Sequence, residues 1–372
     1  MVSGRSKVDV FVIGGGPAGL AAAIAARQRG MSVAVADGTQ PPIDKACGEG
    51  LMPETIAALG ELGVELHPDA GYRFRGIRFL QHDAQVSGEF PHGVGVGIRR
   101  TILHEWLIAR AEECGVRMLW RTPVSAIAKE GVRLPQEFVP ARWIVGADGS
   151  GSRVRRWSGL DSAARQSQRY AVRRHYRTRP WADYVEVYWG QRAQAYVTPI
   201  AREEVCLVVM ASRTEDACFD SMLRDCPQLA DRLSGAELAS RERGAITQMH
   251  SLRDVHSGNV ALVGDASGGV DAITGEGLRL AFRQAIALAD AMERDDLTSY
   301  ARAHREQAWK PALMGDLFLL LARKENLRTR LIRMLSRRPQ LFARLLAVHA
   351  GPAALGDWLS TGAQLGWRFL TP

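Results

Sequence analysis

The sequence has few cysteines, no long apolar run and no cluster of metal-ligating residues. The cysteines are an odd set without C-x-x-C spacing, which argues against both a disulfide framework and a zinc site: Cys47, Cys114, Cys206, Cys218 and Cys226. The apolar run at residues 317–322 is too short to cross a bilayer, and residues 1–7 lead straight into a strand without the apolar stretch of a secretory signal. We therefore expect a cytoplasmic, metal-free protein in a reducing compartment.

The positive charge of the chain is concentrated near one end. The net charge is +8, and residues 323–344 contain eight Lys or Arg but a single acid, Glu325. Leucines spaced three and four apart predict amphipathic helices in this region, broken near Pro339. Their apolar face either packs on the body of the protein or contacts an anionic membrane or a carrier protein. No recognisable nucleic-acid module is present, so we expect no nucleic-acid partner.

A glycine-rich turn near the start of the chain predicts a nucleotide site. Residues 8–13 form a β-branched run typical of a buried parallel strand, and residues 20–29 are alanine-rich and helical. The segment between them has the G-x-G-x-x-G pattern, which permits a tight turn and the approach of a pyrophosphate to a helix amino end: Gly14, Gly16, Pro17, Ala18 and Gly19. A second strand at 32–36 ends in Asp37, which is either an acceptor for ribose hydroxyls or an ordinary strand-end residue. Such a turn fits NAD, NADP or FAD.

Two more glycine-centred segments follow later in the chain. Asp148 and Gly149 come directly after an apolar strand at 143–146, and Arg100 precedes a helix at 101–114. A longer segment lies between a strand at 259–263 and a helix at 278–292, and it contains Gly264, Asp265, Gly275, Glu276 and Gly277. Taken singly, each is also compatible with a strand-end turn or a helix cap.

Together the three segments resemble the FAD-contacting stretches of flavoprotein hydroxylases and related reductases with the p-hydroxybenzoate hydroxylase fold, over roughly residues 8–300. This resemblance implies that Asp148 and Gly149 support the pyrophosphate region and that Arg100 contacts the FAD backbone. It also implies that Asp265, after Gly264, accepts from a ribityl hydroxyl. The backbone of Gly275, Glu276 and Gly277 would then face the isoalloxazine ring, at the positive end of a helix. FAD is the expected cofactor, held noncovalently, with NAD(P)H as a transient electron donor.

A shorter segment bears on substrate chemistry. The stretch from Lys45 to Leu51, with Cys47 and Gly48, is similar to the K-x-C-G-x-G-L loop of the geranylgeranyl reductase branch, where the loop lies beside the flavin. The resemblance places Lys45, Cys47 and Gly48 near the cofactor. Cys47 is then either a redox residue or a small buried side chain, and the glycines shape the pocket.

The order of these patterns predicts an α/β fold with an interrupted cofactor domain. Residues 1–70, 97–160 and 251–300 form a Rossmann-like FAD-binding domain in this interpretation. Residues 71–96 and 161–250 are rich in short alternating strands and form an antiparallel-sheet substrate domain. Residues 301–372 form a helical C-terminal region.

The resemblance leaves two reactions open. One is an NAD(P)H-driven monooxygenase that hydroxylates a lipophilic aromatic or polyketide-type compound; the other is a reductase of carbon–carbon double bonds in an isoprenoid or lipid. The halogenase signature of two tryptophans before an isoleucine–proline pair is absent, and a flavin-binding protein without catalysis is a weaker alternative. Four residues of the strand-rich region are candidate substrate contacts: His175, Tyr188, Trp189 and Tyr196. Cys47 and Tyr196 are also candidate catalytic residues.

Overall fold

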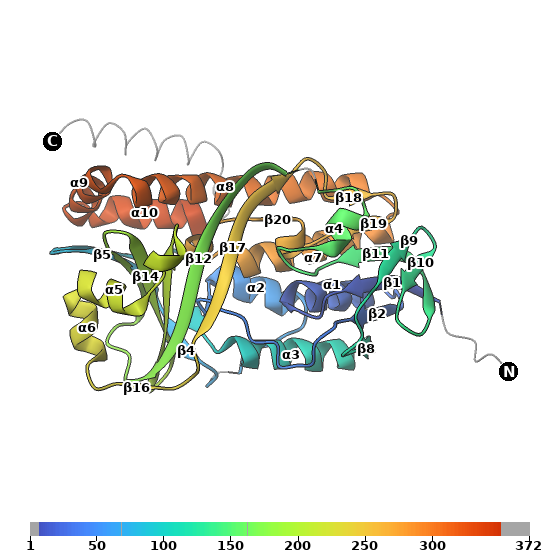
Figure 1. Cartoon of the computed structure of the whole chain (residues 1–372), viewed down its shortest axis with the longest axis horizontal. Coiled ribbons are helices and arrows are strands. Elements are labelled where there is room, and N and C mark those ends of the chain that lie inside the picture. Colours follow the sequence, from blue (N-terminus) through green and yellow to red (C-terminus); the bar gives the residue numbers. More distant parts are fainter. Residues whose placement is uncertain (1–6, 68, 162, 351–372) are drawn as a thin grey trace.

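The computed structural model describes residues 7–67, 69–161 and 163–350. Figure 1 shows a parallel sheet with its helices in one half of the molecule and a larger sheet in the other half. The helices α8, α9 and α10 run along one edge of both halves (Figure 1). This arrangement confirms the predicted α/β architecture, with a helical C-terminal region as far as residue 350; residues 351–372 of the predicted region lie outside the described residues.

The parallel sheet forms because short apolar runs alternate with helices along the chain. Its strand order is β18-β19-β11-β1-β2-β8, and β9 and β10 extend β11 as a hairpin. The bounds are β1 Val8–Ile13, β2 Val33–Ala36, β8 Arg117–Leu119, β9 Ala126–Ala128, β10 Gly131–Arg133, β11 Phe138–Gly146, β18 His256–Ser257 and β19 Val260–Leu262. On one face an apolar core joins the sheet to α1 (Pro17–Gln28), α3 (Arg100–Glu113) and α7 (Gly277–Glu293). The carboxyl ends of β1, β11 and β19 meet at the edge where the three glycine segments begin.

The larger sheet has the order β20-β17-β12-β15-β14-β13-β5-β6, with β16 beside β12. Its pairs are antiparallel except β13 with β5, which are parallel because the chain passes through the cofactor half between these two strands. The bounds are β5 Gly76–Gln81, β6 Ala84–Glu89, β12 Ala163–Arg177, β13 Tyr184–Trp189, β14 Ala193–Ala201, β15 Glu204–Ala211, β16 Glu237–Leu238, β17 Arg243–Leu252 and β20 Gly268–Gly269. The region predicted to be strand-rich also holds two short helices, α5 (Phe219–Asp225) and α6 (Pro227–Leu233).

A small sheet lies between the two halves of the chain. It contains β3 (Gly50–Leu51), β7 (Gly95–Gly97) and β4 (Tyr72–Phe74), and α2 (Pro53–Glu61) follows β3. Residues 71–96 therefore contribute both to this sheet and, through β5 and β6, to the larger one. The exact domain boundaries named above stay a prediction.

The C-terminal helices pack on the larger sheet as well as on the cofactor half. They are α8 (Leu297–Arg323), α9 (Glu325–Ser336) and α10 (Pro339–Ala350), so the predicted break falls at Pro339. Phe342 of α10 packs over Gly88 of β6, where a Cβ would lie 2.9 Å from the ring. Within the described ranges no helix is long and apolar enough to cross a membrane.

Candidate active site

The first glycine segment forms a turn that only glycine permits. Gly14 has φ +112°, and a Cβ there would overlap the carbonyl group of Ala147. A Cβ on Gly19 would overlap the carbonyl oxygen of Gly14, so α1 can approach β1 this closely only without a side chain. The amino end of α1 therefore opens directly toward the cavity described below, which Gly14, Gly16, Pro17 and Ala18 line. Gly19 packs behind the turn and does not line that cavity.

Asp37 holds the same turn from the end of β2. Its Oδ2 accepts from the backbone N–H of Gly15 at 2.8 Å, and its Oδ1 accepts from the backbone N–H of Thr39 at 2.8 Å and from the Thr39 hydroxyl at 2.6 Å. Asp37 also lines the cavity. Among the described residues Oδ2 accepts only the hydrogen bond from Gly15 and keeps a second lone pair, so the predicted ribose contact is compatible with these bonds and stays a prediction.

His104 supports the turn from α3, a role that the sequence reasoning missed. Its Nε2 lies 2.7 Å from the carbonyl oxygen of Gly15, and its Nδ1 lies 3.3 Å from the backbone nitrogen of Ile43. Because Ile43 donates to Nδ1, the ring is neutral and Nε2 donates to Gly15. Burial lowers the pKa of His104, which agrees with that state. The only sequence signal was its place four residues after Arg100.

In the second segment, Asp148 caps the short helix α4 (Arg153–Trp157). Its carboxylate accepts from the Ser152 hydroxyl at 2.5 Å and from the backbone N–H groups of Arg153 and Val154 at 2.6 and 3.2 Å. Gly149 has φ +80° and turns the chain between the strand and this helix. Asp148 and Gly149 line the cavity together with Lys45.

Arg155 connects the second segment to the third. Its guanidinium donates to the carbonyl oxygens of Ser150 at 2.9 Å and Ala266 at 3.2 Å, and it pairs with Asp161 at 2.8 Å. It also lies 2.9 Å from Nε2 of His250, and burial followed by this positive charge lowers the pKa of His250. The structure thus shows this arginine as the link between the second and third glycine segments.

The third segment is held from behind by buried side chains of α7 and α8. Gln284 accepts from the backbone N–H of Gly264 at 2.9 Å, and the Ser267 hydroxyl donates to the Gly264 carbonyl at 2.9 Å. His304 of α8 lies 2.9 Å from that hydroxyl, and burial lowers the pKa of His304 to about 4. Asp265 itself is exposed toward the cavity and has no hydrogen-bond partner in the described part of the chain.

The loop before α7 carries the last predicted cofactor contacts. Gly275 has φ +71°, and Gly275 and Gly277 line the cavity at the amino end of α7. The side chain of Glu276 turns away from the lining and forms an ion pair with Arg279. A buried pair between Arg169 of β12 and Asp271, 3.1 Å apart, ties this loop to the larger sheet.

These segments surround one end of a cavity of about 990 Å³. The polar groups that face it are suited to a dinucleotide: N–H groups at two helix amino ends, the carboxylate of Asp265 and the three cations Lys45, Arg100 and Arg153. Among the cations, Nε of Arg100 is buried without a partner in the described residues, and Lys45 likewise forms no ion pair there. A guanidinium nitrogen without a partner and an unpaired carboxylate, both beside glycine turns, fit FAD. The phosphates would lie at the guanidinium of Arg100 and the ribityl hydroxyls at the carboxylate of Asp265.

The other end of the cavity is an apolar chamber. Its walls come from β5, β13, β14 and the C-terminal helices, and the contribution of the helices was not predicted from the sequence. The wall residues are Ile77, Phe79, Val185, Val187, Tyr196, Thr198, Met314, Leu317, Phe318, Leu321, Leu331, Leu335, Phe342, Leu345, Leu346 and His349. None of these wall residues is an Asp, Glu, Lys or Arg. The chamber is suited to a lipophilic molecule with few polar groups.

Of the predicted substrate contacts, only Tyr196 lines the chamber. Its hydroxyl has no protein partner among the described residues, and burial raises the pKa of Tyr196 well above its usual value. Tyr188 lies on the opposite face of β13, where its hydroxyl contacts Glu186 at 2.6 Å. Trp189 packs behind the wall, 6.1 Å from the ring of Phe79. Strand alternation explains the difference, because Val185 and Val187 face the chamber and Tyr188 cannot.

His175 lies under the Lys45–Leu51 loop rather than in the chamber. Its Nε2 is 2.7 Å from Glu49, whose other oxygen accepts from Arg173 and from the backbone N–H of Arg100, both at 3.1 Å. Glu49 has φ +59°, an uncommon conformation for a non-glycine residue that these bonds hold in place. His175 therefore shapes the loop from below.

Cys47 belongs to the same loop and lines the cavity. Its Sγ accepts weakly from the backbone N–H of Glu49 at 3.4 Å, and the Cys206 thiol lies 3.5 Å from its carbonyl oxygen. Glu49, His175 and Cys206 bring ligand atoms within 4.8 Å of one another. The Glu49 oxygens are already taken by three donors, and burial raises the pKa of Cys206, so this set is a hydrogen-bonded network rather than a metal site.

A nucleotide cradle at the carboxyl edge of a parallel sheet, opening into an apolar chamber beneath a second sheet, defines a FAD-dependent oxidoreductase. The family model for the FAD binding domain matches residues 7–294, and the chain belongs to this family. The predicted cofactor class and fold are thereby confirmed, while the individual residue contacts to FAD stay predictions.

The chain is also similar to named proteins. It is 27% identical over 325 residues to the menaquinone reductase of Mycolicibacterium smegmatis, which covers 80% of each chain. It is 30% identical over 310 residues to a putative 2-heptyl-3-hydroxy-4(1H)-quinolone synthase of Rhodococcus erythropolis, covering 77% of this chain and 80% of the other. The solved structure of a flavoprotein/dehydrogenase from Cytophaga hutchinsonii superposes with a TM-score of 0.83 over 98% of this chain and 99% of the other, at 18% identity.

Proposed function

We propose that this FAD-dependent oxidoreductase is an NAD(P)H-driven monooxygenase that hydroxylates a lipophilic aromatic or polyketide-type compound. The observation that carries this proposal is the continuity of the cavity, in which the apolar chamber opens directly onto the glycine loops of the cradle. The quinolone synthase similarity supports a substrate that combines a ring bearing an oxygen with an apolar tail.

Different residues of the site have different roles in this proposal. Gly14, Gly16 and the amino end of α1 would hold the pyrophosphate, and Asp265 would hold the ribityl chain. When bound, FAD supplies the redox chemistry, accepting two electrons from a nicotinamide and activating oxygen or reducing substrate. The chamber orients the substrate and excludes water from it, and the hydroxyl of Tyr196 is available to hold a polar group of the substrate.

The electron donor is proposed to bind transiently. Only one G-x-G-x-x-G turn in the sequence follows a strand and opens a helix, and FAD occupies that turn in this proposal. NAD(P)H would then approach the open side of the cavity, react and leave. Tight, stoichiometric NADP in purified protein together with FAD would contradict this arrangement.

A second candidate, the reduction of carbon–carbon double bonds in an isoprenoid or lipid, is favoured by the Lys45–Leu51 loop. Gly48 of this loop packs against the ring of Tyr196 so closely that a Cβ on residue 48 would overlap the ring. The loop therefore contributes to the part of the chamber that lies beside the cradle. The similarity to a menaquinone reductase points in the same direction.

One experiment separates these reactions. The purified holoenzyme is given NADPH with an alkyl phenol, an alkyl quinolone or a polyprenyl quinone, in air and without oxygen. A monooxygenase incorporates one labelled oxygen atom from O₂ into the product, whereas a reductase adds two hydrogens in the absence of oxygen. Stimulation of NADPH oxidation by a small polar acid alone would overturn both candidates, and peroxide release without product would indicate an oxidase.

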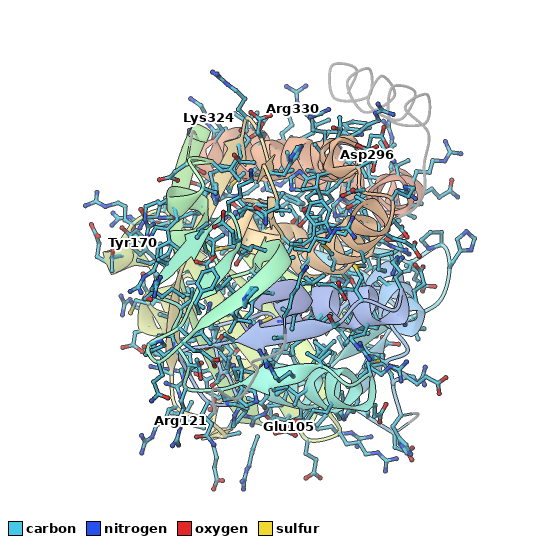
Figure 2. The ribbon with its side chains drawn as sticks, turned by 90° about the vertical axis from the view of Figure 1, so that its right-hand side faces the viewer. Glu105, Arg121, Tyr170, Asp296, Lys324 and Arg330 are labelled. Atoms are coloured by element: carbon cyan, nitrogen blue, oxygen red, sulfur yellow. The ribbon has the colours of Figure 1, made fainter. Side chains whose placement is uncertain are left out.

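We also propose that the C-terminal helices contact an anionic membrane surface. Trp309, Leu313 and Leu320 of α8 are exposed, with Leu313 at 50%, although they are large and apolar. Lys324 and Arg330 lie at the same edge of the molecule, near the carboxyl end of α8 (Figure 2). Apolar side chains interspersed with cations are typical of a surface that binds lipid headgroups, and such contact would bring the chamber close to lipophilic substrate.

A further inference from the structure

His349 of α10 lies where the apolar chamber meets the loop before α7. Its Nε2 is 3.3 Å from the carbonyl oxygen of Thr274 and 3.4 Å from Oε1 of Glu276. His349 lines the cavity together with Gly275, which stands between those two partners. The imidazole thus joins the helix that closes the chamber to the loop that belongs to the cradle.

The two nitrogens of His349 have different surroundings. Both neighbours of Nε2 are acceptors, so Nε2 carries a proton and donates it. In the neutral ring Nδ1 then has a free lone pair. Nδ1 is buried and has no hydrogen-bond partner in the described residues. Because buried polar atoms are nearly always partnered, an orphaned basic nitrogen at a cavity wall indicates a ligand that supplies the missing proton donor.

Charged groups from three helices surround the His349 ring. Glu276 is buried and forms an ion pair with Arg279 of α7. Glu54 of α2 lies nearby, where burial and the charge of Glu276 raise the pKa of Glu54 to about 7. The cations Arg283 and Lys310 face this acidic pair from α7 and α8. Glu276 is thus the carboxylate that lies closest to the His349 ring, at 3.4 Å.

We propose that His349 is a catalytic base of this site that accepts the hydroxyl proton of a phenol or enol bound in the chamber. The O–H bond of the substrate breaks, its electron pair stays on oxygen, and the proton forms a new N–H bond at Nδ1 while Nε2 keeps its own proton. No electrons change hands in this step. The resulting phenolate ring is electron-rich, which is the state that an electrophilic oxygen transfer requires. This inference rests on the proposed oxidation of a lipophilic aromatic compound.

The test compares two ligands and three proteins. Binding of 4-heptylphenol and of its methyl ether to the FAD-loaded enzyme is followed by the change in flavin absorbance, for wild type, His349→Gln and His349→Asn. The glutamine amide can still donate to Thr274 and Glu276 but offers no basic nitrogen. We expect His349→Gln to weaken phenol binding about ten-fold, or ~1.4 kcal/mol, and to leave binding of the ether unchanged. Deprotonation of the bound phenol, measured by its phenolate absorbance, should shift to higher pH in this variant.

A purely structural role of His349 predicts a different pattern. Asparagine cannot reach Thr274, so His349→Asn would weaken both ligands alike while His349→Gln would weaken neither, and this result would overturn the inference. If wild-type enzyme binds both ligands and the phenolate titration is the same in all three proteins, the inference fails while the proposed substrate class survives. If wild type binds neither ligand, the proposed substrate class is itself wrong and the inference falls with it.

Discussion

Single polar side chains shape the cofactor cradle by holding its main chain in place. Asp37 and His104 fix the first turn, Asp148 and Arg155 fix the second segment, and Gln284 fixes the third. These bonds satisfy buried polar groups whose loss would each cost about 1–3 kcal/mol. Asp265 differs from them, because its carboxylate has no protein partner in the described part of the chain.

Asp265→Ala should therefore remove most of the bound FAD without destabilising the apoprotein. A hydrogen bond to a charged group is worth ~1.5–3 kcal/mol, which is roughly 10- to 100-fold in the dissociation constant of FAD. The flavin-to-protein absorbance ratio after gel filtration measures retention, and thermal unfolding of the apoprotein measures stability. Asp254→Ala, at an exposed carboxylate eleven residues earlier, is the matched control. Full retention of FAD by Asp265→Ala would exclude the assigned role.

His304 should make the protein sensitive to acid. Its pKa is about 4 in the folded state, below the usual 6.5, because burial disfavours the charged ring. As pH falls from 6.5 toward 4 the unfolded chain takes up a proton that the folded chain does not, so stability falls over that window by up to about 3 kcal/mol. In His304→Gln the unfolding temperature should fall less steeply between pH 6.5 and pH 4 than in wild type. Parallel curves for the two proteins would contradict this explanation.

At the scale of the elements, helices α8 to α10 complete a chamber that the sheet alone leaves open. Leu317 and Phe318 come from α8, Leu331 from α9 and Leu346 from α10, and all line the cavity. Arg328 of α9, buried, donates to the carbonyl oxygen of Gly190 at 3.1 Å and holds the helices against the larger sheet. The apolar face of these helices therefore serves both the core and the substrate chamber.

Gly48→Ala tests how the loop between β2 and β3 shapes this chamber. The added Cβ would overlap the ring of Tyr196, and overpacking at a buried contact costs about 1–3 kcal/mol. We expect weaker binding of lipophilic ligands, by roughly ten-fold, with FAD retained because the turn at Gly14 is untouched. Gly60→Ala is the control, since a Cβ there meets nothing within 4 Å. Equal ligand binding by both variants would show that the ring of Tyr196 can move aside without weakening the binding of lipophilic ligands.

At the scale of the whole molecule, the location of the positive charge matters more than the net charge of +8 itself. Arg323 at the end of α8, Lys324 between α8 and α9, and Arg333 of α9 are exposed, and the exposed Leu320 lies with Arg323 and Lys324 at the carboxyl end of α8. A surface of this kind should bind anionic vesicles at low salt and release them as ionic strength rises.

Charge reversal at this surface is the corresponding test. The triple variant Arg323→Glu, Lys324→Glu, Arg333→Glu should lose co-sedimentation with phosphatidylglycerol vesicles and keep its FAD content. Reversal of Lys129, Arg179 and Arg241, exposed elsewhere, changes the net charge equally and should leave most of the binding intact. Equal loss in both variants would indicate a general charge effect, and no binding by wild type would exclude the membrane contact and leave a carrier protein to be tested.

Local patterns predicted the cradle well because its requirements are local. Gly14 and Gly19 must lack side chains so that β1 and α1, only a few residues apart in the chain, can pack closely. This constraint therefore involves one short segment of the sequence. Tyr188 and Tyr196 could not be told apart by composition, since both stand in apolar strands. Which of them meets the chamber depends on strand alternation and on the pairing of β13 with β5, more than one hundred residues earlier in the chain.

The sequence by itself therefore determined the cofactor, the α/β architecture and the places of the three glycine segments, because backbone geometry and short-range periodicity decide these. Only the tertiary structure decided what encloses the substrate chamber. The contact between His349 and Thr274 joins residues 75 positions apart, and the bond between Arg328 and Gly190 joins residues 138 apart. Such pairings arise when apolar faces of distant elements are buried together, and no local pattern specifies which faces will meet.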